Sequence, residues 1–172
     1  MVCKKILLTL IIFSGQSIGC TASIRNKKPK NAVSYATVLL INEKSEILLL
    51  RRQNSSFGNG LYSLPGGKVE SGETALEAAK REALEEVGIV IDNLEFVHTL
   101  DRQGPETEFY IFTFKASTWQ GTPSNCEPDK CDDIYWCPPN KLPNNLISAH
   151  RQAIELSLTG VPYSEHGWDG AI

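Results

Sequence analysis

Apolar residues occur in short blocks separated by polar turns from residue 33 onwards, a pattern typical of a domain that contains β-strands. Two β-rich runs, Val33–Asn42 and Glu46–Arg52, are separated by Glu-Lys-Ser and are predicted to form a hairpin. A long loop rich in glycine, asparagine and serine follows, and it contains a predicted short strand at Leu61–Leu64. This part of the chain is therefore expected to be sheet and loop.

The next apolar residues recur at helical spacing and predict an amphipathic helix. Thr74 is suited to cap its first turn, and Glu77, three residues later, completes a capping box. Gly88 stands where the end of a helix requires a residue that tolerates positive φ. The residues predicted to face the core are Leu76, Ala79, Ala83 and Val87.

Strand and helix patterns continue through the rest of the chain. The further predicted strands span Leu94–Leu100, Glu108–Ala116 and Asp133–Cys137. A loop is predicted at Ser117–Lys130, and a second amphipathic helix at Leu146–Leu158, ended by Gly160. Together these elements predict an α+β domain over residues 33–172, with a mixed β-sheet and two main helices.

Length and composition describe one soluble globular domain. With 172 residues, of which 41% are hydrophobic and 22% charged, the chain can bury one core. The formal net charge of −3 and the lack of a Lys/Arg run in the body give no reason to expect a nucleic-acid polymer as partner. The body contains three cysteines, Cys126, Cys131 and Cys137, which match neither a disulfide framework nor a zinc pattern and are expected to be free thiols.

Residues 1–23 differ in kind from the rest. Two lysines precede an apolar run, Ile6–Phe13, and small and polar residues follow, which is the layout of a secretory signal. The run is much shorter than the roughly 20 residues that span a bilayer. The segment ending at Cys20 also resembles a lipoprotein processing site, although Ser17 stands where leucine is usual. Residues 24–32 are polar and basic, and they are predicted to be a linker.

Two interpretations of this leader remain open. If the leader is processed, the domain is exported or lipid-anchored. If it is not processed, the domain is cytoplasmic. No stable membrane span is expected in the domain itself.

Three glutamates gather on one side of the first predicted helix. Glu82, Glu85 and Glu86 lie at i, i+3 and i+4, so they project within a sector of roughly 100°. Like charges at this spacing destabilise a helix by roughly 0.2–0.5 kcal/mol per pair. Few cations stand beside them, and Arg81 is predicted to pair with Glu77 and Glu85, four residues away on either side.

A divalent cation relieves such repulsion better than one arginine does. Mg²⁺ takes oxygen ligands, keeps several waters and is commonly shared with substrate phosphates, and Mn²⁺ is expected to substitute for it. The loop before the helix contains Gly66 and Gly67, which allow the backbone to approach a metal ion and substrate phosphates closely. This combination predicts a metal-assisted phosphate site in which Gly67 contacts the substrate.

The pattern from loop to helix end resembles a known family motif. Gly67-x5-Glu73-x7-Arg81-Glu82-x-x-Glu85-Glu86-x-Gly88-Ile89 is similar to the Nudix box, G-x5-E-x7-R-E-U-x-E-E-x-G-U, where U is a bulky aliphatic residue. Every fixed position is met, and the one departure is Ala83 at the first U, which concerns packing rather than chemistry. The likeness runs from Val33 to about Leu158 and is to the MutT-like branch of Nudix hydrolases. It implies an α/β/α sandwich with a mixed sheet and the hydrolysis of a nucleoside diphosphate linked to another group.

The resemblance also implies roles for residues of the box. The implied metal ligands are the side chains of Glu82, Glu85 and Glu86 and the carbonyl of Gly66. Glu73 would support the loop, and Arg81 would orient the glutamates by ion pairing. The base that accepts the proton of the attacking water would be Glu82, Glu85 or an acid from elsewhere in the chain.

Three residues outside the box resemble further family positions. The segment Trp119–Trp136 is similar to a loop that brings a late glutamate to the metals, and Glu127 holds that position; the alternative is a solvated acid. Arg52 matches an arginine that contacts the nucleotide, or it is an ordinary strand-end charge. Asn145 stands near an asparagine that reads a purine edge, and helix N-capping explains it equally well.

The activity implied by the resemblance is Mg²⁺-dependent hydrolysis of nucleoside triphosphates to monophosphate and pyrophosphate. The alternatives are a pyrophosphatase for ADP-ribose or another nucleotide sugar, and a catalytically silent nucleotide-binding module. Two departures weaken an assignment to oxidised guanine: Leu64 replaces a phenylalanine before Pro-Gly-Gly, and the family's Asp-Arg pair is missing from Gly104–Phe109. The three histidines show no metal-ligand spacing and are expected to have surface or core roles. The base and the oligomeric state are left open.

Overall fold

The structure is a computed structural model that describes residues 31–104 and 106–168. The predicted leader and residues 24–30 of the predicted linker lie outside the described residues. The first strand begins at Asn31, so the last two residues of the predicted linker belong to it.

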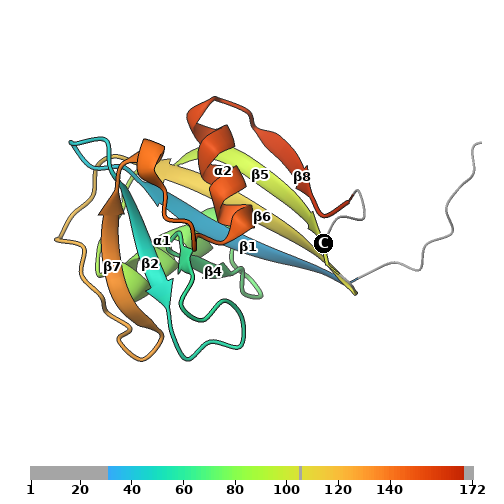
Figure 1. Ribbon diagram of the computed structural model, residues 1–172, viewed down its shortest axis with the longest axis horizontal. Coiled ribbons are helices and arrows are strands. Elements are labelled where there is room, and N and C mark those ends of the chain that lie inside the picture. Colours follow the sequence, from blue (N-terminus) through green and yellow to red (C-terminus); the bar gives the residue numbers. More distant parts are fainter. Residues whose placement is uncertain (1–30, 105, 169–172) are drawn as a thin grey trace, which may run out of the picture.

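The elements follow one another as eight strands, two α-helices and one 3₁₀ turn in the described part of the chain (Figure 1). In order they are β1 (Asn31–Leu40), β2 (Ile47–Arg52), β3 (Tyr62–Ser63), β4 (Gly66–Lys68), α1 (Ala75–Val87), β5 (Glu95–Gln103), β6 (Thr107–Ala116), β7 (Cys131–Cys137), η1 (Pro139–Lys141), α2 (Ser148–Leu158) and β8 (Tyr163–His166). The sequence pattern predicted both helices and most strands, but not β4 or β8.

The strands form two sheets rather than the single mixed sheet that was predicted. The larger sheet has the order β4-β1-β6-β5-β8, with parallel pairs β1–β6 and β5–β8 and otherwise antiparallel pairs. The smaller sheet, β3-β2-β7, is antiparallel. The α+β class and the mixed character of the sheet are confirmed.

The predicted hairpin between the first two strands is present only at its tip. A single bridge joins Ile41 to Ile47, and the amide of Asn42 donates to the carbonyl of Glu46. Beyond this turn β1 pairs with β4 and β6, whereas β2 pairs with β3 and β7. The prediction of a full hairpin is wrong because both strands find partners that lie far away in the sequence.

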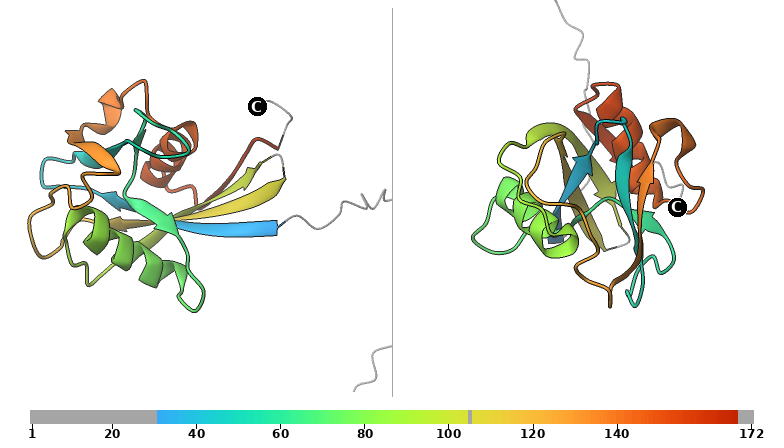
Figure 2. Two further views of the ribbon diagram at one scale, coloured as in Figure 1. Left: turned by 90° about the horizontal axis from the view of Figure 1, so that it is seen from below. Right: turned by 90° about the vertical axis from the view of Figure 1, so that its left-hand side faces the viewer.

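The two helices lie on opposite sides of the strands, as a sandwich requires (Figure 2). Successive residues of β1 face opposite sides, as in any strand. Val38 packs in the core beneath α1, and Leu39 packs in the core beneath α2. Leu48 and Leu49 of β2 divide in the same way. Since both faces are covered there, the buried parts of the two strands, residues 38–40 and 47–50, are continuous apolar runs.

Helix α1 begins and ends where the sequence predicts. The hydroxyl of Thr74 accepts from the amide of Glu77, and the Glu77 carboxylate accepts from the amide of Thr74, which completes the capping box. Gly88 ends the helix at φ 69° and donates its amide to the carbonyl of Leu84. The prediction that Leu76 faces the core is wrong: it lies in the first turn, before the first buried residue of the helix, and is 40% exposed.

Two further expectations concern single features. Cys126, Cys131 and Cys137 are free thiols, as predicted. Within the described ranges, no helix is long and apolar enough to cross a membrane.

Candidate active site

One cavity of about 800 Å³ opens between the sheets and receives side chains from nearly every element. Its acidic side is formed by Glu82 and Glu86 of α1 and by Glu127 of the loop before β7, next to Gly66 and Gly67 of β4. We call these five residues the acidic wall. A cavity of this size is in the range of small-molecule sites.

The two glycines of the acidic wall are fixed by β4. Gly66 pairs with Thr37 of β1 and has φ 146°, and a Cβ built on it would lie 2.3 Å from the carbonyl oxygen of Ala36. A Cβ on Gly67 would lie 2.2 Å from Oε1 of Glu82. Glycine at both positions therefore lets strand β4 sit against β1 and lets the Glu82 carboxylate sit against β4.

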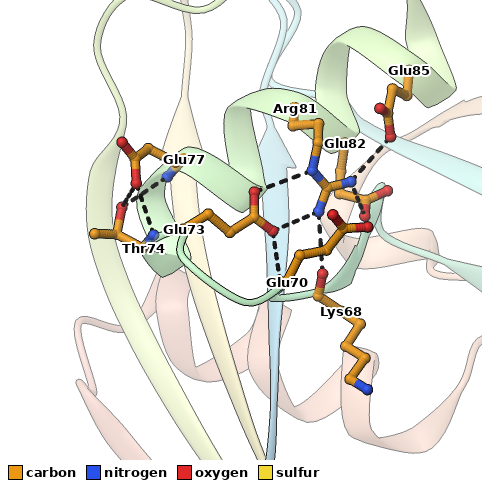
Figure 3. Close-up of polar contacts among 8 residues, drawn as sticks. All are labelled: Lys68, Glu70, Glu73, Thr74, Glu77, Arg81, Glu82 and Glu85. Atoms are coloured by element: carbon orange, nitrogen blue, oxygen red, sulfur yellow. Dashed lines mark hydrogen bonds and ion pairs between the residues drawn. The ribbon is translucent and has the colours of Figure 1, made fainter.

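Arg81 holds the box residues together (Figure 3). Its guanidinium donates to both carboxylate oxygens of Glu73, at 3.1 and 2.7 Å, and to the carbonyl of Lys68 at 3.1 Å. It also forms ion pairs with Glu82 at 2.7 Å and Glu85 at 3.0 Å. These hydrogen bonds from Arg81, together with one from the amide of Glu70, lower the pKa of Glu73.

The predicted ion pair between Arg81 and Glu85 is confirmed, and the predicted pair with Glu77 is wrong. The Glu77 carboxylate is already bonded to the amide and hydroxyl of Thr74 in the capping box. Glu73 takes its place, because the loop returns past the helix and brings this side chain to the guanidinium. Arg81 therefore ties the loop to the helix, which helix spacing alone does not indicate.

Glu82 and Glu85 have different surroundings although they share Arg81. The side chain of Glu82 is 14% exposed and faces the cavity, and burial raises its pKa, while the ion pair with Arg81 acts in the opposite direction. The side chain of Glu85 is 52% exposed and does not line the cavity. The structure thus brings Glu82, but not Glu85, to the acidic wall.

Glu86 is the carboxylate with the least compensation. It accepts one hydrogen bond, from the amide of Gly66 at 2.7 Å, and forms no ion pair with any described residue. Burial raises its pKa to about 8, and the nearby charges of Glu82 and Glu127 act in the same direction. A partly buried, desolvated carboxylate with free acceptor capacity is costly unless a cation approaches it.

These surroundings fit a divalent cation. Between residues 31 and 168, residue 105 aside, no three His, Cys, Asp or Glu side chains converge closely enough to hold a metal ion. The carboxylates of Glu82, Glu86 and Glu127 nevertheless face one cavity, and the charge of Glu127 helps to raise the pKa of both Glu82 and Glu86. A hard cation with oxygen ligands would relieve this repulsion, and Mg²⁺ is such a cation.

Glu127 reaches the acidic wall because its loop docks on the end of α1. The amides of Ser124 and Cys126 donate to the carbonyls of Val87 and Glu86, which lack partners inside the helix. Nζ of Lys130 lies 2.6 Å from Oε1 of Glu127. The loop therefore carries a carboxylate and its own counter-ion to the same cavity.

Of the two remaining predicted site residues, one lines the cavity and the other does not. Arg52 lines the cavity and donates to the carbonyl of Phe57 and the hydroxyl of Ser55. Asn145 does not line it; its side-chain amide donates to the carbonyl of Gly60 at 2.8 Å. It is not the cap of α2 either, because that helix begins after Ile147.

A second group of residues that line the cavity was not predicted from the sequence. The guanidinium of Arg102 lies over the rings of Phe57 and Phe109, with distances to the centroids of 5.9 and 5.6 Å. His150 of α2 and Tyr35 of β1 complete this part, and we call these five residues the aromatic wall. An Asp-Arg sequence does occur outside Gly104–Phe109, at Asp101–Arg102 on β5. Strand alternation could have pointed to Arg102, but nothing local marks His150.

The raised pKa of Glu86 predicts a pH-dependent stability of the metal-free protein. The folded pKa, about 8, lies above the ordinary 4.5, so the stability linked to this proton is complete below pH 4.5 and is lost as the pH rises towards 8. Each unit of difference between the folded and unfolded pKa lowers the free energy of unfolding by about 1.4 kcal/mol at most. Glu86→Gln removes this loss and keeps an acceptor for Gly66. In EDTA we expect the variant to melt several degrees above wild type at pH 8 and at the same temperature at pH 4.5.

Glu85→Gln is the matched control for this melting experiment, because that side chain on the same helix is half exposed. No pH-dependent gain is expected for it. An equal gain for Glu86→Gln at both pH values would contradict the raised pKa assigned to this carboxyl.

Comparison with known proteins gives the same family throughout. The sequence model of the NUDIX domain matches residues 31–156. The 8-oxo-dGTP diphosphatases of Escherichia coli and Haemophilus influenzae are 32% and 35% identical, over 53% and 55% of this chain and 70% and 69% of theirs. The crystal structure of a MutT NUDIX hydrolase from Burkholderia pseudomallei superposes with a TM-score of 0.68 at 26% identity, over 74% of this chain and 98% of that one. The chain belongs to the NUDIX domain family.

Proposed function

We propose that the protein is a Mg²⁺-dependent pyrophosphohydrolase that cleaves nucleoside triphosphates to the monophosphate and pyrophosphate. The observation that carries the proposal is the acidic wall: two partly buried carboxylates, one of them without a described ion-pair partner, face a cavity of about 800 Å³ in a chain of the NUDIX family. Relatives named 8-oxo-dGTP diphosphatase support nucleoside triphosphates as the substrate class.

The residues proposed to hold the metal are Glu82, Glu86, the carbonyl of Gly66 and, from the loop, Glu127. Bound Mg²⁺ would neutralise phosphate charge and lower the pKa of a coordinated water. Glu85 remains a proposed ligand only if its ion pair with Arg81 opens and the side chain turns to the cavity. Mn²⁺ is proposed to substitute, because it accepts the same oxygen ligands.

The proton of the attacking water requires a carboxylate that can accept it. Glu127 is proposed for this step, since it faces the cavity on a loop and its ion pair with Lys130 can be exchanged for other partners. Arg81 is a positioning residue: it fixes Glu82 and ties the helix to Glu73. Arg52 and the backbone at Gly67 are proposed to contact the nucleotide.

The choice of base is part of the proposal. The relatives' names favour oxidised purine nucleotides, whereas Leu64 departs from the MutT pattern. The second departure, the missing pair at Gly104–Phe109, also stands, although Arg102 of β5 lines the cavity. Purine triphosphates, including their 8-oxo forms, are therefore the first substrates to test.

A panel of substrates with Mg²⁺ tests the function. It contains dGTP, 8-oxo-dGTP, dATP and ADP-ribose, with the products separated by anion-exchange chromatography. We expect nucleoside monophosphate and pyrophosphate from the triphosphates. Preferred cleavage of ADP-ribose to AMP and ribose 5-phosphate would move the protein to nucleotide sugars. Binding without turnover on any substrate would make it a silent nucleotide-binding module.

Arg81→Lys is expected to lower kcat by about 10- to 100-fold, the usual effect of losing a residue that orients metal ligands. One ammonium cannot replace the planar fork that bonds Glu73, Glu82 and the Lys68 carbonyl at the same time. The Mg²⁺ concentration for half-maximal rate is expected to rise as well. Arg151→Lys, on α2 beside Glu155, is the control and should behave as wild type. A wild-type kcat and Mg²⁺ requirement in Arg81→Lys would contradict the positioning role.

A further inference from the structure

His150 is held in one tautomer on the wall of the cavity. The amide of Leu64, a residue that is 2% exposed, donates to Nδ1 of His150 at 2.9 Å. A nitrogen that accepts a hydrogen bond carries a lone pair, so in the neutral ring the proton is on Nε2. The imidazole therefore offers the cavity an N–H donor.

The charge state of the ring supports this arrangement. Burial lowers the pKa of His150 to about 4, and the positive charges of Arg52 and Arg102 act in the same direction. At neutral pH the imidazole is therefore uncharged, and its Nδ1 stays available to Leu64. The ring is a fixed donor rather than a proton carrier.

The neighbours of His150 on the cavity wall share this donor character. Arg52 and Arg102 have only N–H donors, while the hydroxyls of Tyr35 and Ser63 can donate or accept. Phe57 and the phenyl ring of Phe109 add flat apolar faces, with the guanidinium of Arg102 over both. A flat ring that carries carbonyl oxygens complements such a surface.

The orientation of a nucleotide in the cavity follows from its charges. Its phosphates belong at the acidic wall, where the metal is proposed to bind, so its base is left for the aromatic wall. This step rests on the proposed function. If an exocyclic amino group of the base faced His150, two N–H donors would point at each other and neither would find an acceptor. A carbonyl oxygen at the same place would accept a hydrogen bond from Nε2.

We propose that His150 is a specificity-determining residue whose Nε2–H donates to a carbonyl oxygen of the base, so that 6-oxo purines are preferred over 6-amino purines. The ring is presented by α2 and steadied by the backbone before Pro65. One neutral hydrogen bond changes affinity by about 3- to 10-fold, and a donor left facing a donor adds to the difference.

Two substitutions separate the two ring nitrogens. In His150→Asn, the side-chain oxygen can accept from Leu64 in place of Nδ1, but no group reaches the position of Nε2. In His150→Gln, the longer side chain can bring its amide N–H to the position of Nε2. His150→Asn therefore keeps the acceptor for the Leu64 amide and loses the N–H donor to the base. His150→Gln keeps the N–H donor.

The measurement is the ratio of kcat/KM for dITP and dATP in competition, together with calorimetric binding of dIMP and dAMP without metal. We expect wild type and His150→Gln to prefer the 6-oxo nucleotide by about tenfold, and His150→Asn to prefer it by less than about twofold. A preference that persists in His150→Asn, or that wild type lacks, would overturn the proposal.

The binding arm separates this proposal from the proposed function. If no nucleotide is hydrolysed but the preference for dIMP follows the variants as expected, the function fails and the role of His150 stands. If triphosphates are hydrolysed with a preference that does not depend on His150, the function stands and the role of His150 fails.

Discussion

Glu86→Gln is expected to lower kcat by about 100- to 1,000-fold while the protein stays folded. Glu86 is partly buried and forms no ion pair with a described residue, so only the Gly66 amide and the charge of Arg52 stabilise its charged form before a metal ion binds. Removing one group that stabilises the charge of a transition state costs about 3–4 kcal/mol, which is a factor of several hundred to a thousand. The measurement is single-turnover hydrolysis of dGTP at saturating Mg²⁺, at pH 8.

Glu85→Gln is the matched comparison, because it removes the same charge from the same helix. That side chain is 52% exposed and contacts Arg81 rather than the cavity, so a smaller loss is expected, of about tenfold. In the melting experiment Glu86→Gln is expected to be more stable than wild type, although it is nearly inactive. This combination is expected where an active site holds an unfavourable charge. Equal losses of kcat in both variants would show that Glu85 turns to the metal and that the acidic wall must include it.

Gly66→Ala is expected to lower the free energy of unfolding by about 3 kcal/mol or more. The added Cβ would lie 2.3 Å from the carbonyl oxygen of Ala36 and 2.7 Å from Cα of Thr37, at φ 146°. These are backbone atoms of β1, which lies between β4 and β6 in the larger sheet, so they cannot move aside without disturbing its pairing with these strands. For a domain of this size the melting temperature should fall by roughly 10 °C.

Gly67→Ala provides the control for this experiment. Its Cβ would meet only the end of the Glu82 side chain, at 2.2 Å from Oε1, and that side chain can rotate away. We expect its melting temperature to change by less than about 3 °C, while kcat falls because Glu82 is displaced from the cavity. If both alanine variants melt alike, the different roles given to the two glycines would be wrong.

The helix of the box was predictable because its signals are local. Thr74 and Glu77 form the capping box and Gly88 ends the helix, all within one continuous segment. The positions of Glu82 and Glu86 follow from helix geometry once the buried stripe is known. The same reasoning failed for Leu76, because the spacing of apolar residues does not show how far the sheet extends beneath the first turn.

Features that depend on distant pairing were not predictable. β1 and β2 diverge into two sheets because their partners β6 and β7 lie more than sixty residues further along the chain. His150 meets Leu64 only after α2 has packed, and no spacing around it marks a site. Arg81 pairs with Glu73 rather than Glu77 because the capping box already uses Glu77.

Glu127 was predicted only in part from the sequence. Family resemblance singled it out in a loop that contains several acidic residues, and the sequence alone left a solvated acid as the alternative. What brings it to the cavity is the docking of Ser124 and Cys126 on the last carbonyls of α1, which sequence patterns do not record. Its role as a base remains a proposal, and Glu127→Gln would test it.

We propose that the acidic wall, with a bound divalent cation, hydrolyses a phosphoanhydride. The most direct test incubates dGTP with wild type in Mg²⁺, with wild type in EDTA, and with Glu86→Gln in Mg²⁺, and separates the products by anion-exchange chromatography. The account predicts dGMP and pyrophosphate in equal amounts, formed only by wild type in Mg²⁺. Formation of dGDP and phosphate, or turnover that persists in EDTA or in Glu86→Gln, would contradict it.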